Sequence, residues 1–457
     1  MTGQDFLALQ QEKIFRPALM DAIINEFEPP ADMFKFTEKF LPLKNVEKDE
    51  MIALVKGGTF GMTNPVNLGA EHVRVGMPSY FYKAVQPGYW RESIMFDEEV
   101  LTSLKRPDKP DELWGEGLVG EALNVLDMRL NVLIEHLSAV TVQRNGYSIN
   151  RNNVSYTYNA SIPSKYYLYL GLAAEVPVST EANGLVSGSY QVNPFVRFDH
   201  ATHAATDLWS ALTTSQPLRD LRHAIHYFSD QGFTTTQVWM SRNVAGLMED
   251  NTTSNGIRGL VEANPAAAGK MITAELIITA LVGIKGLTPV IDDRRYLEES
   301  PVMRAALATD TVIYLADVDS FAVGDWVTIR NDSTGTEEDR QISAVSSANR
   351  TITVGAITYS LQAGTSRVTC SKNYMMNDRV IFCGEQNERA PRGYWVSTPS
   401  LVKAQDYKNP VPGRYTWTYF NTKVPYYIET GAGIHGGPQV LGPGGWLTMV
   451  VRGKTAL

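Results

Sequence analysis

The sequence predicts an α+β protein, in which one long helix is combined with helix–strand–helix units and with groups of short strands. Three observations lead to this fold class: a helical apolar stripe over residues 114–144, alternating helix and strand signals from residue 215, and closely spaced strand signals over 307–371. The 457 residues are 44% hydrophobic, which is enough to fill a core organised as about two to four structural units.

The first 45 residues are predicted to form an arm with one short helix. Leu19, Ile23 and Phe27 lie four residues apart on one helical face, and Pro29-Pro30 ends the pattern. So few apolar positions give an isolated helix little to bury. We therefore expect these three side chains, together with Phe15, to pack on another chain.

Residues 46–95 are predicted to form an extended hairpin. One strand-like segment begins at Met51, and a second contains the aromatic run Tyr80, Phe81 and Tyr82. The glycines and the Asn-Pro pair between the two segments are typical of a long tip. An ordinary surface hairpin is one interpretation. The other places the aromatic run in a contact between subunits.

The clearest periodicity predicts a long helix over about residues 114–144. Its apolar positions step by four and three residues along one face: Val119, Leu123, Leu126, Leu130, Leu133, Leu137 and Val140. Asp127, Glu135 and His136 fall outside this stripe, and Asn145-Gly146 supplies a C-terminal stop. At about 1.5 Å per residue the rod is roughly 45 Å long. A short coiled coil is the alternative, but the lack of paired charges at the flanking positions favours a packed long helix.

From residue 215 the sequence alternates between helix and strand signals. Ser215 is a candidate cap, and Pro217 suits the first turn of a helix. The buried face of that helix is predicted to consist of Leu218, Leu221, Ile225 and Phe228. A strand at Thr235–Met240 follows, and Ser241 is the candidate cap of the next helix. A second unit leads from a helix at Ile272–Leu281 into a strand at Thr288–Ile291.

Residues 307–371 change character and predict a small all-β domain. Five short strand candidates follow one another: Val312–Leu315, Trp326–Ile329, Arg340–Ile342, Thr351–Val354 and Arg367–Thr369. Such spacing is typical of a small sandwich or barrel. Helical sequence precedes this segment, and a mixed core resumes at Val380, so the segment is best explained as an inserted domain.

Composition and charge narrow the functional class. The formal net charge is −8 and no run of Lys or Arg occurs, which argues against a dedicated nucleic-acid-binding protein. Cys370 and Cys383 are the only cysteines, so we predict two buried thiols made in a reducing compartment. No signal peptide precedes the arm, and the most apolar stretch, residues 276–284, is too short to cross a bilayer. We expect cytoplasmic synthesis, no membrane contact and no cofactor.

Four of the seven histidines offer the best argument for an enzyme. His200 and His203 form an H-x-x-H pair, and so do His223 and His226. Such pairs lie on one helical face and can hold zinc. The sequence has no H-E-x-x-H motif and no Glu spaced to act as its base. We predict no metal site and no catalytic residue; a soluble zinc enzyme is the alternative from another functional class.

Two further patterns are weaker. Residues 431–436 match G-x-G-x-x-G, but the following Gly437-Pro438 prevents the helix that a dinucleotide site requires, so we interpret the match as a glycine-rich loop. The carboxylates Asp292-Asp293 and Asp97-Glu98-Glu99 are interpreted as solvated ends of strands or helices.

Taken in order, several segments resemble the major capsid protein E family of tailed bacteriophages, whose members adopt the Hong Kong 97-type capsid fold. The matching segments are Phe40–Glu50 with the entry into the extended loop, 46–95 with that loop, 114–144 with the spine helix, Pro217–Leu247 with the axial domain, and Asn377–Phe382 with a late strand motif. The resemblance rests on order and spacing and covers most of the chain outside 307–371. The Asp378-Arg379 form of the late motif is atypical, so no detail is transferred there.

The resemblance implies five segments along the chain: an arm (1–45), an extended loop (46–95), a peripheral domain with the spine helix (96–212), an axial domain (213–306) and a return to the capsid core (372–457). The inserted β domain (307–371) lies outside the common core of the family. It also implies a structural role in the virion, as pentamers and hexamers of an icosahedral head assembled in the host cytoplasm.

The partners that the resemblance implies are further copies of the chain, a separate scaffolding protein, a portal, a decoration or cement protein where one is present, and packaged double-stranded DNA contacted non-specifically. An encapsulin-type nanocompartment shares the fold and is the closest alternative.

Overall fold

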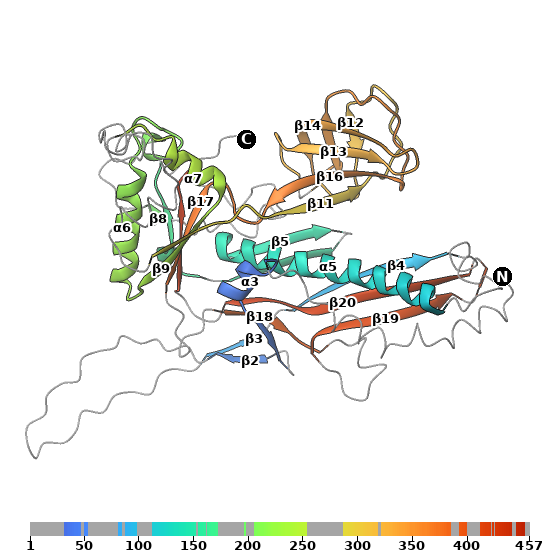
Figure 1. Ribbon diagram of the computed structural model, residues 1–457, viewed down its shortest axis with the longest axis horizontal. Coiled ribbons are helices and arrows are strands. Elements are labelled where there is room, and N and C mark those ends of the chain that lie inside the picture. Colours follow the sequence, from blue (N-terminus) through green and yellow to red (C-terminus); the bar gives the residue numbers. More distant parts are fainter. Residues whose placement is uncertain are drawn as a thin grey trace, which may run out of the picture. The chain divides into compact units, whose positions relative to one another are not determined.

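The computed structural model is a mixed helix-and-sheet protein, in agreement with the predicted α+β class (Figure 1). It describes residues 32–46, 50–53, 81–84, 87–97, 112–151, 154–160, 162–171, 196–197, 205–253, 287–318, 321–384, 393–399, 412–421, 423–424, 426–440 and 445–452. The chain divides into two compact units, Met1–Ser138 with Glu388–Gly442 and Ala139–Asn387 with Pro443–Leu457. Within the described segments, none of the helices combines the length and the hydropathy that a transmembrane span requires.

The predicted long helix is confirmed as α5, Glu112–Arg144, and it runs from the first unit into the second. Every position of the predicted apolar stripe is buried except Leu133, which is half-buried beside the buried Ile134. Asp127 and Glu135 lie off the stripe, yet both are buried, because the helix is packed on more than one face. The helix ends where predicted, at Asn145 with φ 64° and Gly146 with φ 140°.

The first unit contains a five-stranded sheet with the order β1-β18-β20-β19, in which β4 also pairs with β20. Its strands are β1 Leu43–Asn45, β4 Gly88–Phe96, β18 Gly393–Ser397, β19 Arg414–Asn421 and β20 Tyr427–Val440. The 14-residue β20 is central and antiparallel to β4, β18 and β19. Because side chains alternate along a strand, Glu92 and Arg414 share one face, and Tyr89 and Tyr419 share the opposite face.

A separate strand pair and a short helix complete the described part of the first unit. β2 Glu50–Ala53 is antiparallel to β3 Phe81–Ala84, with Ile52 opposite Tyr82 and Ala53 opposite Phe81. The two strand-like segments predicted within 46–95 are therefore partners, as a hairpin requires. The tip of that hairpin, like the predicted arm helix, lies outside the described residues. The short helix is α3, Lys35–Phe40.

In the second unit a six-stranded mixed sheet has the order β10-β9-β17-β21-β7-β8. Its strands are β7 Tyr167–Tyr169, β8 Val196–Arg197, β9 Thr235–Met240, β10 Thr288–Ile291, β17 Arg379–Gly384 and β21 Trp446–Val450. The late strand motif, 377–382, begins in the turn before β17 and continues into this strand, which is buried along its whole length between β9 and β21. The predicted strands at 235–240 and 288–291 are confirmed, with parallel pairing between them.

Helices α6, Pro217–Asp230, and α7, Arg242–Glu249, flank β9 in sequence and lie beside this sheet in Figure 1. The predicted apolar face of α6 is buried, and the Ser241 hydroxyl caps α7 by accepting a hydrogen bond from the Val244 N–H at 3.3 Å. The prediction that Ser215 caps α6 was wrong. Gln216 holds the cap position without a side-chain bond, and the Ser215 hydroxyl instead accepts from the Asn251 amide at 2.8 Å. The helix predicted at 272–281 lies outside the described residues.

The second unit also contains a six-stranded antiparallel sheet with the order β11-β16-β13-β14-β15-β12. Its strands are β11 Arg295–Pro301, β12 Val312–Tyr314, β13 Trp326–Asn331, β14 Thr336–Ser346, β15 Thr351–Val354 and β16 Ser366–Asn373. All five strand segments predicted within 307–371 are strands here. β11 precedes the predicted range and pairs with β16 along its whole length.

This sheet closes into a barrel. Val302, just after β11, bridges Leu315, just after β12, so the first and last strands of the sheet meet. Two backbone hydrogen bonds flank this bridge, from the Met303 N–H to the Tyr314 carbonyl at 2.8 Å and from the Ala316 N–H to the Pro301 carbonyl at 3.0 Å. Inside is a single apolar cluster: Val302, Ala306, Ile313, Leu315, Val318, Phe321, Val327, Ile329, Ile342, Ile352, Val354, Ile357, Leu361, Val368 and Cys370. The predicted sandwich or barrel is thus a barrel with its own core.

Both cysteines are buried and free, as predicted. Burial in the barrel core raises the pKa of the Cys370 thiol to about 11.

Gly146 provides a test of how α5 is terminated. A Cβ at this position would lie 2.2 Å from the Tyr158 carbonyl oxygen, where β5, Gly146–Arg151, pairs with β6, Val154–Asn159. The positive φ adds strain for any other residue, so Gly146→Ala is expected to destabilise the second unit by about 2 kcal/mol or more in thermal unfolding. Gly120→Ala is the matched control, because open space surrounds Gly120 on α5, and helix propensity predicts a gain of about 0.5–1 kcal/mol. Equal stability of the two variants would contradict this account.

Candidate functional site

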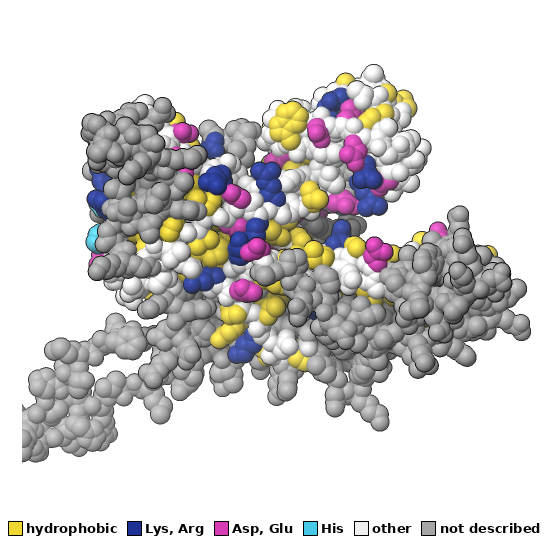
Figure 2. Space-filling model, viewed as in Figure 1, with side chains coloured by type: hydrophobic (Ala, Val, Ile, Leu, Met, Phe, Trp, Pro, Cys, Tyr) yellow, Lys and Arg dark blue, Asp and Glu magenta, His cyan; other side chains and the backbone are white. Residues whose placement is uncertain are grey.

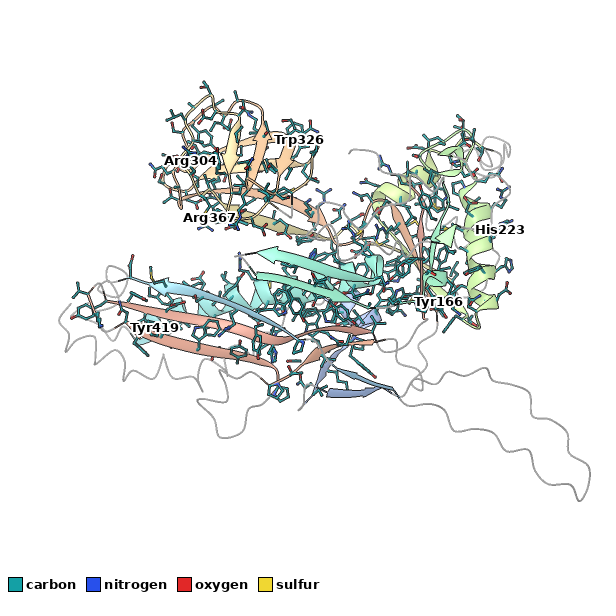
Figure 3. The ribbon with its side chains drawn as sticks, turned by 180° about the vertical axis from the view of Figure 1, so that it is seen from behind. Tyr166, His223, Arg304, Trp326, Arg367 and Tyr419 are labelled. Carbon is teal, nitrogen blue, oxygen red and sulfur yellow. The ribbon has the colours of Figure 1, made fainter. Side chains whose placement is uncertain are left out.

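The histidine pairs do not form a site in the described residues. His223 and His226 are exposed on the outer side of α6, where Figure 3 labels His223, while His200 and His203 lie outside the described residues. Within the segments that the structure describes, no three His, Cys, Asp or Glu side chains come together in a group that could hold a metal ion.

The G-x-G-x-x-G match was expected in a loop, and this expectation was wrong: residues 431–436 lie inside β20. The glycines are required by close packing. A Cβ on Gly431 would lie 2.1 Å from the Trp417 ring, and one on Gly436 would lie 2.3 Å from the Val396 carbonyl oxygen. Because these glycines have no side chains, the Trp417 ring and the neighbouring strand β18 can pack directly against the backbone of β20.

Asp292 was predicted to be solvated, and this was also wrong. It is buried, and its carboxylate accepts hydrogen bonds from the Arg294 Nε and Nη2, each at 2.8 Å. Asp293 is exposed, as expected, and it accepts from the Arg242 N–H at 3.1 Å at the start of α7. The two carboxylates thus form hydrogen bonds at the turn between β10 and β11. Asp97 is exposed, while Glu98 and Glu99 lie outside the described residues.

The predicted subunit contacts fall mostly outside the described residues, namely Phe15, Leu19, Ile23, Phe27 and Tyr80. Phe81 and Tyr82 are described through their backbone pairing in β3. For these positions an intersubunit contact stays a prediction.

The end of the predicted arm, in contrast, is fixed to its own chain. Phe36 and Phe40 of α3 are fully buried. The Glu135 carboxylate accepts hydrogen bonds from the Phe36 N–H at 2.7 Å, the Thr37 N–H at 2.9 Å and the Thr37 hydroxyl at 2.8 Å. A carboxylate at the amino end of a helix satisfies N–H groups that have no partner within the helix. The prediction of an arm over residues 1–45 is therefore wrong for α3, which packs on its own chain.

A second buried polar group on α5 holds the sheet of the first unit. The Arg414 guanidinium of β19 donates to the Asp127 carboxylate and to the Asn131 side-chain oxygen, and the Asn131 amide donates to Asp127 at 3.1 Å. Burial raises the pKa of the Asp127 carboxyl, and the charge and hydrogen bond of Arg414 offset part of this effect. Arg129, two residues after Asp127 on the exposed side of α5, pairs with Glu92 of β4.

The carboxyl end of α5 is held in a similar way within the second unit. The buried Arg379 of β17 donates to the Gln143 carbonyl oxygen. The Gln143 side chain donates to the Tyr374 carbonyl at 2.9 Å and accepts from the Met376 N–H at 2.8 Å. A cation at the carboxyl end of a helix can bond the last carbonyl groups, which have no partner within the helix. Arg379 thus caps the carboxyl end of the long helix.

Some large side chains on the other face of the first unit's sheet, and in the turn before β20, are exposed, although Tyr415 and His435 on that face are buried. Tyr89 and Met95 of β4, Tyr419 of β19 and Val424 in the turn before β20 are large apolar side chains that the described chain leaves open (Figure 3 labels Tyr419). Such a group on one sheet face is typical of a surface that another molecule covers.

Sequence reasoning missed these contacts. Glu135 and Arg414 look like ordinary polar positions, and their partners lie far away in the sequence. The one available signal was that Asp127, Asn131 and Glu135 follow one another at four-residue spacing along a single line of the helix.

No protein-family model matches the sequence, and no curated protein matches it. Among solved structures the chain is similar to a prophage capsid protein from Escherichia coli CFT073, with 12% identity and a TM-score of 0.47, over 96% of this chain and 99% of that chain. It is also similar to the procapsid of satellite phage P4, with 8% identity and a TM-score of 0.40, over 98% and 95% of the two chains. A third similar structure is an encapsulin complex from Synechococcus elongatus, with 6% identity and a TM-score of 0.35, over 96% of each chain.

The Arg414 contact provides a test with a defined pH dependence. Arg414→Met leaves the Asp127 carboxylate buried without its cation, and we expect a loss of about 3–5 kcal/mol in unfolding free energy at pH 7. Without Arg414 the pKa of Asp127 rises further. A raised pKa in the folded state gives stability at low pH that is lost as the pH rises through it. The loss should therefore be smaller at pH 5 than at pH 7 in urea unfolding.

Arg91→Met is the matched control, because Arg91 is an exposed arginine on β4. It should change the unfolding free energy by less than about 0.5 kcal/mol at either pH. A loss for Arg414→Met that does not change with pH would contradict the role assigned to the pair.

Proposed function

We propose that this chain is the major capsid protein of a tailed bacteriophage, a structural subunit of the Hong Kong 97-type fold that assembles into the pentamers and hexamers of an icosahedral head. The chain acts through repeated contacts between copies and not through catalysis. In this proposal it is made in the host cytoplasm and resides in the virion, and the barrel is a domain inserted into the capsid core.

One observation carries the proposal: elements of the expected type occur at the residues that resemble the family, in the same order along the chain. Strand pairing of β2 with β3 occurs where the extended loop is expected, α5 where the spine helix is expected, and α6, β9 and α7 where the axial helix–strand–helix is expected. The late motif continues into β17.

The surface of the described chain supports a role in assembly. A face of the first unit's sheet carries exposed Tyr89, Met95 and Tyr419, which a neighbouring copy would cover. Glu135 fixes α3 at the inner end of the proposed arm. The contacts proposed for Phe15, Leu19, Ile23 and Phe27 would then start from a rigid point, and Tyr80, Phe81 and Tyr82 would extend the contact from the hairpin.

The charge of the chain suits a container for nucleic acid. A formal net charge of −8 limits non-specific attachment of free subunits to DNA or RNA before assembly. In the proposed head the packaged double-stranded DNA is contacted without sequence preference. A scaffolding protein, a portal and a cement protein are the further partners of this proposal.

The test is assembly of the expressed chain, followed by electron microscopy. Closed icosahedral particles are expected, alone or with the scaffolding protein from the same source. A chain that stays monomeric under every condition and has an enzymatic activity that depends on bound zinc would favour the enzyme alternative. Particles that enclose a cargo enzyme and no DNA would favour an encapsulin-type compartment.

Deletion of residues 1–28 tests the arm. We expect loss of particles in electron microscopy and a folded monomer in size-exclusion chromatography, because α3 and its contact with Glu135 are retained. A full-length control with Phe15, Leu19, Ile23 and Phe27 changed to Ala separates the loss of apolar side chains from the loss of chain length. Particles of normal size from the deleted chain would refute the role of the arm.

A further inference from the structure

The barrel carries an unusual share of the apolar surface. Of the thirteen large hydrophobic side chains that the described residues leave exposed, seven lie on it: Leu297, Met303, Leu307, Val312, Tyr314, Val323 and Trp326. Figure 2 shows hydrophobic side chains next to charged ones on its surface. A barrel without open strand edges cannot recruit a partner by strand addition, so any partner must be bound through side chains.

The first group of these residues, the Trp326 patch, consists of Leu297, Val323 and Trp326. Leu297 of β11 lies opposite Ser371 of β16, and the register of β16 with β13 places Trp326 on the other side of Ser371. The two apolar side chains are therefore on one outer face, about 10 Å apart across three strands. Trp326 is 65% exposed and Leu297 is 70% exposed. Val323 lies in the turn that leads into β13.

The second group, the Tyr314 patch, consists of Met303, Leu307, Val312 and Tyr314. Met303 and Tyr314 are cross-strand neighbours at the closure of the barrel, and Val312 lies two residues before Tyr314 on the same face of β12. Met303 is 61% exposed and Leu307 is 69% exposed. The Arg304 guanidinium lies over the Tyr314 ring, 5.2 Å from its centre.

The two aromatic side chains, Trp326 of the first patch and Tyr314 of the second, lie on opposite sides of the barrel. In the order β11-β16-β13-β14-β15-β12, strands β13 and β12 are three apart in a ring of six. Figure 3, which labels Trp326 and Arg304, shows them on opposite sides of the domain. Two different patches on opposite sides are what a head-to-tail contact between identical domains requires, whereas a two-fold contact uses one patch twice.

The charges around the two patches are partly complementary. In the row next to Trp326, the outer face carries the exposed carboxylates Glu299 and Asp339, and Glu299 is already paired with Arg367 at 2.7 Å. The Tyr314 patch is bordered by the exposed Arg304 and by Arg350, and it also contains Asp310, whose carboxylate accepts from the Leu307 N–H at 2.8 Å. Asp339 is thus the carboxylate of the first patch that can meet an arginine of the second, and an arginine can also stack on the exposed Trp326.

The small size of the two patches indicates that they form contacts only within a larger assembly. A stable pair of soluble proteins buries about 800 Å² on each partner, and three or four side chains cover less than this. A single contact would be too weak to hold two free subunits. In an assembly that already holds the copies side by side, each weak contact is repeated and acts at high local concentration.

We propose that the barrel links neighbouring copies of this chain, with the Trp326 patch of one barrel packed against the Tyr314 patch of the next. This inference rests on the proposed function, because it requires copies that are arranged in a shell. Trp326 is the apolar anchor of the contact, and Arg304 is the positive partner for the opposing Asp339 carboxylate.

The test uses two single variants of the full chain, Leu297→Cys and Leu307→Cys, which leave Trp326 and Tyr314 in place. The native thiols are buried, and the raised pKa of Cys370 keeps it unreactive toward a short bis-maleimide. Particles assembled from an equal mixture of the two variants should give cross-linked dimers, and particles of either variant alone should give monomers. Adding Trp326→Ser to both variants should lower the dimer yield about tenfold. Thr334→Cys, exposed in the turn after β13, replaces Leu307→Cys as the control and should give no dimers.

The outcomes distinguish the two proposals. Absence of particles from the unmodified chain, both alone and with the scaffolding protein, overturns the capsid function and this inference together. Particles that form normally but give no dimers in the mixture overturn the link between barrels alone. Dimers from Leu297→Cys particles by themselves would show that like patches meet, which overturns the head-to-tail arrangement.

Discussion

A buried carboxylate must be neutralised or fully hydrogen-bonded, and this constraint organises the structure around α5. The helix buries Asp127, Asn131 and Glu135 at four-residue spacing among its apolar side chains. Each of them bonds a segment remote in sequence, Arg414 of β19 for the first two and the start of α3 for Glu135, and the Asn131 amide also donates to Asp127 within the helix. A purely apolar helix could slide or rotate against its neighbours at small cost, because apolar contacts are not directional. The polar groups fix one register, at the cost that the loss of any partner leaves a charge buried.

The same logic extends to the end of the helix. Gln143 and Arg379 join the last turn of α5 to β17, the strand at the centre of the second unit's sheet. Within the first unit, the bonds of the helix are made by the carboxylates of Asp127 and Glu135. Within the second unit, they are made by the backbone carbonyl and the side-chain amide of Gln143. Directional bonds thus hold α5 along its middle and at its carboxyl end, and a rod fixed in this way would suit the proposed role as a shell subunit.

Local signals predicted the elements whose stability is local. The stripe of α5, the Pro217 start and apolar face of α6, the Ser241 cap and the alternating strands of the barrel were all readable, because each depends on neighbours within a few residues. The misses have a common cause. β20 looked like a loop because its glycines are explained by Trp417 and Val396, which come from other strands. Glu135 and Asp292 looked like solvent-facing charges because their burial depends on tertiary packing. Ser215 failed as a cap because Asn251, thirty-six residues later, takes its hydroxyl.

The closure of the barrel has a thermodynamic consequence. Only a short seam joins β11 to β12, made of the bridge between Val302 and Leu315 and its flanking backbone bonds. Such a seam is where local opening begins, as hydrogen exchange would detect, because few bonds have to break there. Met303 and Tyr314 straddle it, so any molecule that covers both side chains binds the closed form and not the opened one. By linkage, a molecule bound over Met303 and Tyr314 stabilises the closed barrel, and it binds the closed barrel more tightly than the opened one.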